Sequence, residues 1–538
     1  MNQLSPYRES VLRRRPLAVC IASLFSLAAP AAMAANRPVT SCLDDGSPGT
    51  LRSVVASPST VSGDTVDLSA LACAYSKITL DTGGSRILVP QASLTIKGPG
   101  AAALAIDGSA LASDAPNTSN VFEHTGNGTL AIKYLSVTGG HKKQTAISAR
   151  GGCIFSNGSV TLDGAEISSC SAQSAEGAEG GGIWAQGDLL VVNSTVSGNS
   201  ASSAGPVRGG GLMADGNVIL LRSRVSENTL SSGGRASGGG IYTYGDLTAI
   251  HSTVHANSVT TSNPSSDAVG GGAVVGGDFA STYATISDNH LYAQQSDGGG
   301  LALSASATIF ASTISGNSAN LGGGIQAYSS PSAGHVFLMR NSTVSGNSAA
   351  NMGGGIFVNA ATTKFYNSTI AFNTAANAGP GVRLSAFGGP MDVTLQSTLM
   401  SDNVYTNAPI ENDLAAAGPT ITFNQAPANN LINVTGVGGL PSDTLFLTCP
   451  LLGPLRDNGG PTKTHALSTT SPAIDAGNNA SIDPLTQLPY ASDQRGLAAD
   501  NGEGVRDYVR VSGTSADIGA YEVQQNDVVF NAGFEGCL

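Results

Sequence analysis

Three aspartates stand at the same position of successive sequence repeats, each directly after a glycine. They are Asp188, Asp246 and Asp278, and Asn217 fills this position in the repeat between the first two. Carboxylates clustered on one face can bind Ca²⁺ or supply the acid and base of polysaccharide cleavage. Aspartate after glycine is also typical of a tight turn, where its side chain bonds to nearby backbone. We therefore interpret the row as turn residues, and Ca²⁺ or carbohydrate binding is the alternative.

A second group that could bind a ligand is apolar. Trp184, Met213 and Tyr242 follow an inward aliphatic position in three consecutive repeats, so strand alternation predicts that they point outward. Sugar rings stack on exposed aromatic faces. We favour a second interpretation, in which the variable loops at residues 171–179 and 202–208 cover these side chains.

Titratable residues also gather near the C-terminus, where Asp457, His465, Asp475, Asp493 and Arg495 could be read as an active site. The turns, ion pairs and buried hydrogen bonds of a lid need the same residue types. We favour the lid.

The repeats themselves are short of acids, since none lies between Asp297 and Asp392. The coils in this stretch therefore lack the carboxylate pair that hydrolysis of a glycosidic bond needs. Arg340 occupies a position that is apolar in other repeats, which we attribute to a register shift after the insert at residues 329–335. We predict no catalytic residue, no cofactor and no metal, with Ca²⁺ at the aspartate row as the one open possibility.

Sequence repeats position these residues. The triplet Gly-Gly-Gly begins at Gly180 and recurs at intervals of 24 to 32 residues up to Gly353, with degenerate copies at Gly151 and Gly379. Each repeat continues with an aliphatic residue, a Gly-Asp-type turn, an alternating apolar run and a Ser-Thr-Val-Ser-Gly-Asn motif. Such short β-branched runs between Gly and Asn are typical of strands. A period of this size indicates stacked structural units.

Like residues recur at equivalent positions, which predicts an all-β, right-handed parallel β-helix (solenoid) with in-register coils about 4.8 Å apart. An asparagine ends every motif, and its side-chain amide should bond to the same amide of the next coil. The predicted ladder consists of Asn199, Asn228, Asn257, Asn289, Asn317, Asn347 and Asn373, continued by Asn403.

Six cysteines remain once a leader containing Cys20 is removed. Cys153 replaces the third glycine of its repeat and Cys170 replaces the asparagine of the same repeat, so we predict that they form a disulfide. The other candidates for structural disulfides in an exported chain are Cys42, Cys73, Cys449 and Cys537, whose pairing the sequence leaves open.

The first 34 residues predict a signal peptide, because arginines precede an apolar stretch and the sequence Ala32-Met33-Ala34. No later segment has the 18 consecutive apolar residues of a membrane helix, so we expect an exported chain without one. The net charge of -12 becomes about -15 once four arginines and one glutamate of the leader are removed, which argues against a nucleic-acid partner.

Four C-terminal segments carry a resemblance to a known family. They lie at residues 452–467, 471–477, 493–496 and 517–522, and the last three read Ser-Pro-Ala-Ile-Asp-Ala-Gly, Asp-Gln-Arg-Gly and Asp-Ile-Gly-Ala-Tyr-Glu. In this order they closely resemble the choice-of-anchor Q domain of bacterial surface β-helix proteins. The repeats resemble those of polymorphic outer-membrane and adhesin-type proteins. The resemblance implies display outside the cell.

These observations predict six regions. They are a signal peptide (1–34), an N-terminal cap with the first coils and a short helix near Thr50 (35–120), β-helix repeats (121–405), a connecting segment (406–444), a C-terminal capping module (445–522) and a tail (523–538). We expect a secreted or cell-surface structural or adhesin-like protein without catalytic activity. Its partner would be a cell-surface or extracellular polysaccharide or a host surface. The alternative is a carbohydrate-active enzyme of the polysaccharide lyase or glycoside hydrolase type.

Overall fold

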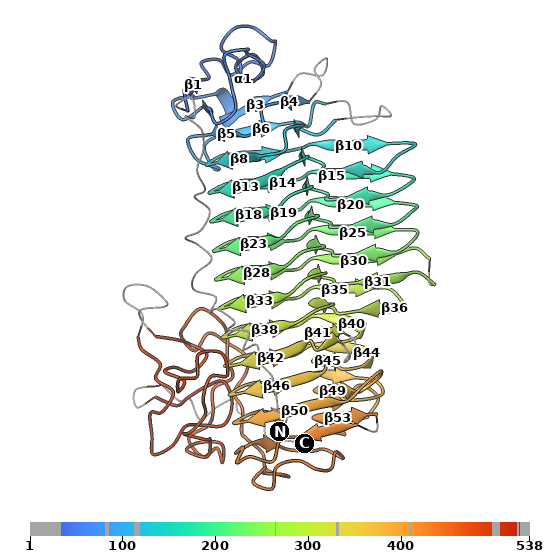
Figure 1. Ribbon diagram of the computed structural model, residues 1–538, viewed down its shortest axis with the longest axis vertical. Helices are drawn as coiled ribbons and strands as arrows, with labels where there is room; N and C mark the ends of the chain where they lie inside the picture. The colour runs from blue at the N-terminus through green and yellow to red at the C-terminus, as the bar shows by residue number, and fades with distance from the viewer. Residues whose placement is uncertain are drawn as a thin grey trace, which may run out of the picture.

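The chain winds into a parallel β-helix, which confirms the predicted fold class (Figure 1). The structure is a computed structural model that describes residues 34–80, 86–111, 119–263, 265–329, 333–408, 410–418, 420–497, 506–524 and 527. Three sheets, here called A, B and C, run along the stack with 14, 13 and 12 strands, and neighbouring coils pair in parallel.

One coil illustrates the others. It contributes β17 (Ile183–Ala185) to sheet C, β18 (Leu189–Val192) to sheet A and β19 (Thr195–Ser197) to sheet B. The chain then leaves the body through β20 (Ser200–Ser203) and returns through β21 (Val207–Arg208) to begin the next coil. Ile183 pairs with Leu212, and Val196 pairs with Val225, so equivalent residues lie directly above one another.

The sheets extend over nearly the whole described chain. Sheet A runs from β1 (Asn36–Pro38) to β54 (Ile421–Phe423), sheet B from β3 (Lys77–Thr79) to β55 (Leu431–Ile432), and sheet C from β4 (Ile87–Val89) to β53 (Leu414–Ala417). The stack therefore begins well before the first glycine triplet, at about residue 36.

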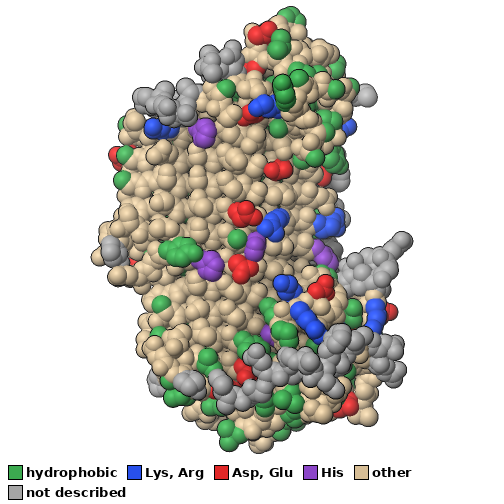
Figure 2. Space-filling view, turned by 180° about the vertical axis from the view of Figure 1, so that it is seen from behind, with side chains coloured by type: hydrophobic (Ala, Val, Ile, Leu, Met, Phe, Trp, Pro, Cys, Tyr) green, Lys and Arg blue, Asp and Glu red, His purple; other side chains and the backbone are tan. Residues whose placement is uncertain are grey.

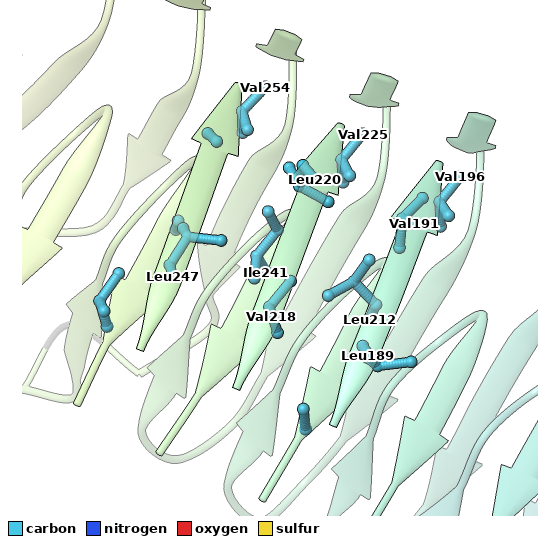
Figure 3. Close-up of a cluster of buried hydrophobic side chains, with 14 of the residues drawn as sticks. Leu189, Val191, Val196, Leu212, Val218, Leu220, Val225, Ile241, Leu247 and Val254 are labelled. Carbon is cyan, nitrogen blue, oxygen red and sulfur yellow. The ribbon is translucent and has the colours of Figure 1, made fainter. Parts of the chain in front are cut away.

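The interior is a set of aliphatic columns. Every second residue of a strand faces inward, so the side chains of β18 alternate between buried and half-buried. Leu189, Val218 and Leu247 stack coil upon coil (Figure 3). Burial of these side chains at about 25 cal/mol per Å² of apolar surface is the main favourable contribution to the fold.

The outgoing and returning strands form a second, thin β-structure that projects from the body, here called the fin (Figure 1). Its outgoing strands run from β10 (His141–Gln144) to β40 (Ser318–Leu321), and its returning strands from β11 (Ala149–Arg150) to β36 (Gln295–Asp297). The two layers enclose a narrow core of small residues. This core contains Ala149, Ala172, Ala178, Ala201, Val207, Leu230, Ala236, Val259, Ala268, Leu291 and Ala319. The segments that the sequence indicated as variable loops are therefore paired strands, because small inward residues allow the layers to approach.

The asparagine column lies at the buried corner between sheet B and the fin. Each side-chain amide donates to the Oδ1 of the next asparagine, over 3.0 Å from Asn199 to Asn228 and 2.9 Å from Asn228 to Asn257. The same Oδ1 also accepts the backbone amide of the preceding asparagine. The series continues to Asn403, whose amide donates to Asp413, so a carboxylate makes the last rung.

The glycine triplet packs against this ladder, and its three members are glycine for different reasons. Gly180 has a φ of +65°, a left-handed conformation that side chains disfavour. A Cβ on Gly181 would lie 2.1 Å from the carbonyl oxygen of Gly210 in the next coil. A Cβ on Gly182 would lie 3.0 Å from the side chain of Asn199.

The third glycine and the asparagine of one coil are thus neighbours, and this explains the disulfide. Cys153 and Cys170 occupy these two positions and are bonded, with Cα atoms 5.5 Å apart, which confirms the predicted pair. Cys42 and Cys73 form a second disulfide near the N-terminal end. Cys449 is also disulfide-bonded, and Cys537 lies outside the described residues.

The two ends of the core are covered in different ways. The predicted N-terminal helix is present as α1 (Leu51–Val55), capped by the side chain of Thr50, and it buries Leu51 and Val55 in the main core. At the other end, Val437 and Leu440 of the connecting segment pack against the core. In the part of the chain that the structure describes, no helix has the length and apolar character for a membrane crossing.

The C-terminal module packs along the side of the stack rather than over its end, so its predicted position as a lid was wrong. Its residues contact the outward face of sheet B in the last coils, where Thr313, Thr343 and Thr369 are buried. Gln494 bridges two of them, since its Oε1 accepts from the Thr343 hydroxyl at 2.6 Å and its Nε2 donates to Thr313 at 2.8 Å. Outward threonines therefore supply the hydroxyls, and Leu399 and Leu431 the apolar surface, on which the module docks.

Arg340 belongs to the same contact. It pairs with Phe310 in unbroken register, so the predicted register shift was wrong. Its side chain points outward and forms a buried ion pair with Asp483 of the module. An arginine fits this position because Asp483, which lies 143 positions later in the sequence, places its carboxylate against it.

Candidate functional site

The aspartate row lies at the turn between sheets C and A and bonds along the stack. The Oδ1 of Asp188 accepts the backbone amide of Asn217 at 2.7 Å, and the Oδ1 of Asp246 accepts that of Asp278 at 2.8 Å. The Oδ1 of Asn217 likewise accepts the backbone amide of Asp246 at 2.8 Å. These side chains hold successive turns together, which is the structural interpretation of the row. Among the described residues, no three His, Cys, Asp or Glu side chains are grouped so that they could hold a metal ion.

The C-terminal candidates have separate structural partners. His465 is buried and bridges the module to sheet B, with Nδ1 2.6 Å from the carbonyl of Gly453 and Nε2 2.8 Å from the hydroxyl of Ser345. Burial lowers the pKa of His465 to about 4, so the ring is neutral and Nδ1 carries the proton. Asp457 and Asp475 are exposed and accept backbone amides of Gly459 and Ser515.

Asp493 and Arg495 form the buried centre of the module. The two side chains are fully buried and 2.7 Å apart. The Arg495 guanidinium lies 4.0 Å from the ring centroids of both Tyr508 and Tyr521. Ion pairing with Asp493 raises the pKa of Arg495 although burial opposes it. This ion pair between two aromatic rings stabilises an irregular segment that has few strands of its own.

The aromatic candidates lie under the fin. Trp184 is 4% exposed and Met213 is 1% exposed, while Tyr242 is half-buried. Trp184 stacks on Phe155 with ring centroids 4.9 Å apart, and Arg150 of the returning strand β11 lies 4.7 Å from its centroid. The fin thus covers these outward side chains, and Trp184 presents no open ring face for a sugar.

A charged cluster that was not predicted from the sequence accompanies the aromatic residues. Glu179 pairs with Arg150 at 2.8 Å and with Arg208 at 3.0 Å, across three successive returning strands. Arg208 lies 5.7 Å from the ring centroid of Tyr242. A signal was present in the sequence, because these residues directly precede the glycine triplets of three consecutive repeats and alternate in sign.

Asp215 lies near this cluster at the rim of sheet C. Burial, and then the neighbouring carboxylate of Glu179, raise the pKa of Asp215, although Arg150 and Arg208 oppose this. A carboxyl group with a raised pKa near a second carboxylate and two arginines is an arrangement that general acid–base chemistry uses. The side chain of Asp215 is largely exposed, and Glu179 forms ion pairs with both arginines.

A hollow of about 480 Å³ opens where the N-terminal edge of the fin meets sheet C. Three cationic side chains and one carboxylate line it, together with polar and apolar groups. Its lining consists of Arg86, Glu123, Lys142, Gln144, Ile147, Ser148, Arg150 and Phe155. Cations from the body and from the fin approach one another here around open space.

Comparison with known proteins adds no relative. No model of a protein family matches the chain, and no curated protein is similar to it in sequence. The fold and the side-chain arrangement therefore carry the functional argument.

Proposed function

We propose that this chain is an exported, non-catalytic β-helix protein that acts at the cell surface or outside the cell as a structural or adhesin-like element. The observation that carries the proposal is the use of the recurring polar side chains. The asparagine column and the aspartate row both bond from coil to coil, so they maintain the stack. Such a stack offers long side walls for contact with a large partner.

Other features support export and display. Two disulfides join cysteines of the described chain, and disulfides persist in oxidising compartments. The face shown in Figure 2 is broad and carries few charged side chains above the C-terminal module. The C-terminal segments that resemble a choice-of-anchor Q domain would help to retain the protein at the surface, and residues 1–34 would direct its export.

Cell fractionation tests this proposal. The full chain, expressed in a bacterial host, should appear in the envelope or the medium without residues 1–34, and protease added to intact cells should degrade the surface-bound fraction. An intracellular chain that keeps residues 1–34 would contradict it. If the protein stayed inside the cell and still bound saccharides, the proposal of surface display would fail and only saccharide binding would remain.

The carbohydrate-active enzyme is a second candidate, favoured by the raised pKa of Asp215 beside Glu179, Arg150 and Arg208. Acidic and neutral polysaccharides are incubated with the protein and assayed for new reducing ends and for unsaturated products. The enzyme would be established, and our proposal refuted, if the protein were active and the variants Asp215→Asn and Glu179→Gln were inactive. The variant Asp188→Asn should then remain active. Asp188 is the matched control because it lies at an exposed turn and bonds only along the stack.

A further inference from the structure

Lys142 occupies an unusual position in the fin. It pairs with Ala172, so strand alternation places it in the column of inward residues that continues with Ala201, Leu230 and Val259. These members are buried in the fin core, whereas Lys142 is half-buried at the open N-terminal end. A lysine thus stands where every later coil has an apolar residue.

The ammonium group of Lys142 faces other charges without a partner of its own. Arg86 is paired with Glu123, and Arg150 is paired with Glu179. Lys142 forms no hydrogen bond or ion pair with the residues that the structure describes. Burial lowers the pKa of Lys142, Glu123 raises it and Arg86 lowers it. A half-buried cation that forms no ion pair of its own, beside two further cations and one carboxylate already paired with Arg86, is a site that attracts an anion.

The remaining lining suits a sugar ring. Phe155 is half-buried and forms one wall, and Ile147 is exposed at the mouth. Gln144 and Ser148 add groups that donate and accept hydrogen bonds. The volume of about 480 Å³ lies in the range of pockets that bind small molecules.

We propose that this hollow binds one acidic unit of a saccharide, with its carboxylate or sulfate between Lys142, Arg86 and Arg150 and its ring against Phe155. The site would capture an acidic polysaccharide locally although the chain as a whole is strongly acidic. This inference deepens the proposed function, on which it rests, by naming the ligand class and the contact point.

The chain carries its own reporter for this test. Trp184 is its only tryptophan, and it contacts Arg150 and Phe155, which both line the hollow. The full chain is titrated with trigalacturonate, a sulfated chondroitin tetrasaccharide and neutral maltotriose, and tryptophan fluorescence is followed with calorimetry as a second readout. Binding of at least one acidic saccharide, weakened by added salt, is expected, and maltotriose should not bind. The two acidic arms distinguish carboxylate from sulfate.

The decisive variant is Lys142→Met, which keeps the apolar stem and removes the charge. Loss of one charge-assisted contact should weaken binding about tenfold. The matched control is Lys143→Met, which changes the net charge equally but replaces the adjacent residue of β10, on the opposite side of the strand. Lys143→Met should bind as the unchanged protein does.

Three results would overturn the inference. They are the absence of acidic-saccharide binding by both readouts, equal binding of maltotriose, and equal weakening by the two lysine variants. If the unchanged protein binds nothing and Lys142→Met self-associates, Lys142 protects the open fin edge instead. None of these results affects surface display, which fractionation measures separately, so failure here is distinguishable from failure of the proposed function.

Discussion

Asn257 lies in the middle of the buried asparagine column, and its replacement by alanine tests how strongly the column stabilises the stack. The side chain is fully buried and takes part in four hydrogen bonds. It accepts from the backbone and side-chain amides of Asn228 at 3.1 and 2.9 Å. It donates to the Val225 carbonyl at 3.1 Å and to Asn289 at 2.9 Å.

At a net contribution of about 1 kcal/mol for each hydrogen bond, Asn257→Ala should lower the free energy of unfolding by about 4 kcal/mol. The site is closely packed, because Asn257 is fully buried and a Cβ on Gly240 would lie 2.9 Å from its Cγ. The backbone amide of Asn228 would lose the side-chain acceptor that it has now.

Urea unfolding followed by circular dichroism measures this loss, and fluorescence of Trp184 reports on the coils before Asn257 as a second probe. The matched control is Asn217→Ala, because Asn217 makes the same kind of coil-to-coil bond at an exposed turn. Water can replace that bond, so the control should lose less than about 1 kcal/mol. Equal destabilisation of the two variants would refute the reasoning, since burial of the ladder would then contribute nothing.

Three further outcomes follow from the structure. The double variant Cys153→Gly/Cys170→Asn restores the glycine–asparagine pair of the other coils, so a reductant should lower its thermal midpoint less than that of the unchanged protein, because the variant keeps only the disulfides of Cys42–Cys73 and Cys449. The pKa of His465 is lowered to about 4, against about 6.5 when unfolded, so the folded state binds fewer protons between these values. The stability from this group is therefore complete above pH 6.5 and is lost as pH falls toward 4, by about 3 kcal/mol. Limited proteolysis of the C-terminal module should speed up over this range, and a flat pH profile would contradict the assignment. Arg495→Met leaves the Asp493 carboxylate buried without its ion pair, which costs about 3–5 kcal/mol. The module should then be cleaved by protease while circular dichroism of the coils is retained, and an intact module would show that the ion pair is dispensable.

The sequence alone carried much of the fold because the same contact recurs in every coil. A residue and its equivalent 29 positions later are neighbours in the coil of β17 and the next, so the column of like residues is visible as a period. The Cys153–Cys170 pair was predictable for the same reason, since it departs from the repeat at two adjoining positions.

Less of the candidate site could be predicted. Local turn chemistry and strand alternation indicated a turn at the aspartate row and an outward position for Trp184. The hollow and its cations were not predicted, since Arg86, Lys142 and Arg150 come from three separate segments that share no sequence pattern. Only the alternating charge before the glycine triplets gave a hint of the Arg150–Glu179–Arg208 cluster.

Only the tertiary structure determined the contacts that do not follow from the repeat. The fin required two short stretches of small residues to pack on each other, and each stretch by itself resembles a polar loop. An outward threonine recurs in most coils of sheet B, yet the module buries only those of the last ones. Arg340 pairs with a residue 143 positions away. Periodicity encodes the neighbours within a stack, whereas docking on its outer faces depends on shape and charge that become adjacent only after the coils have formed.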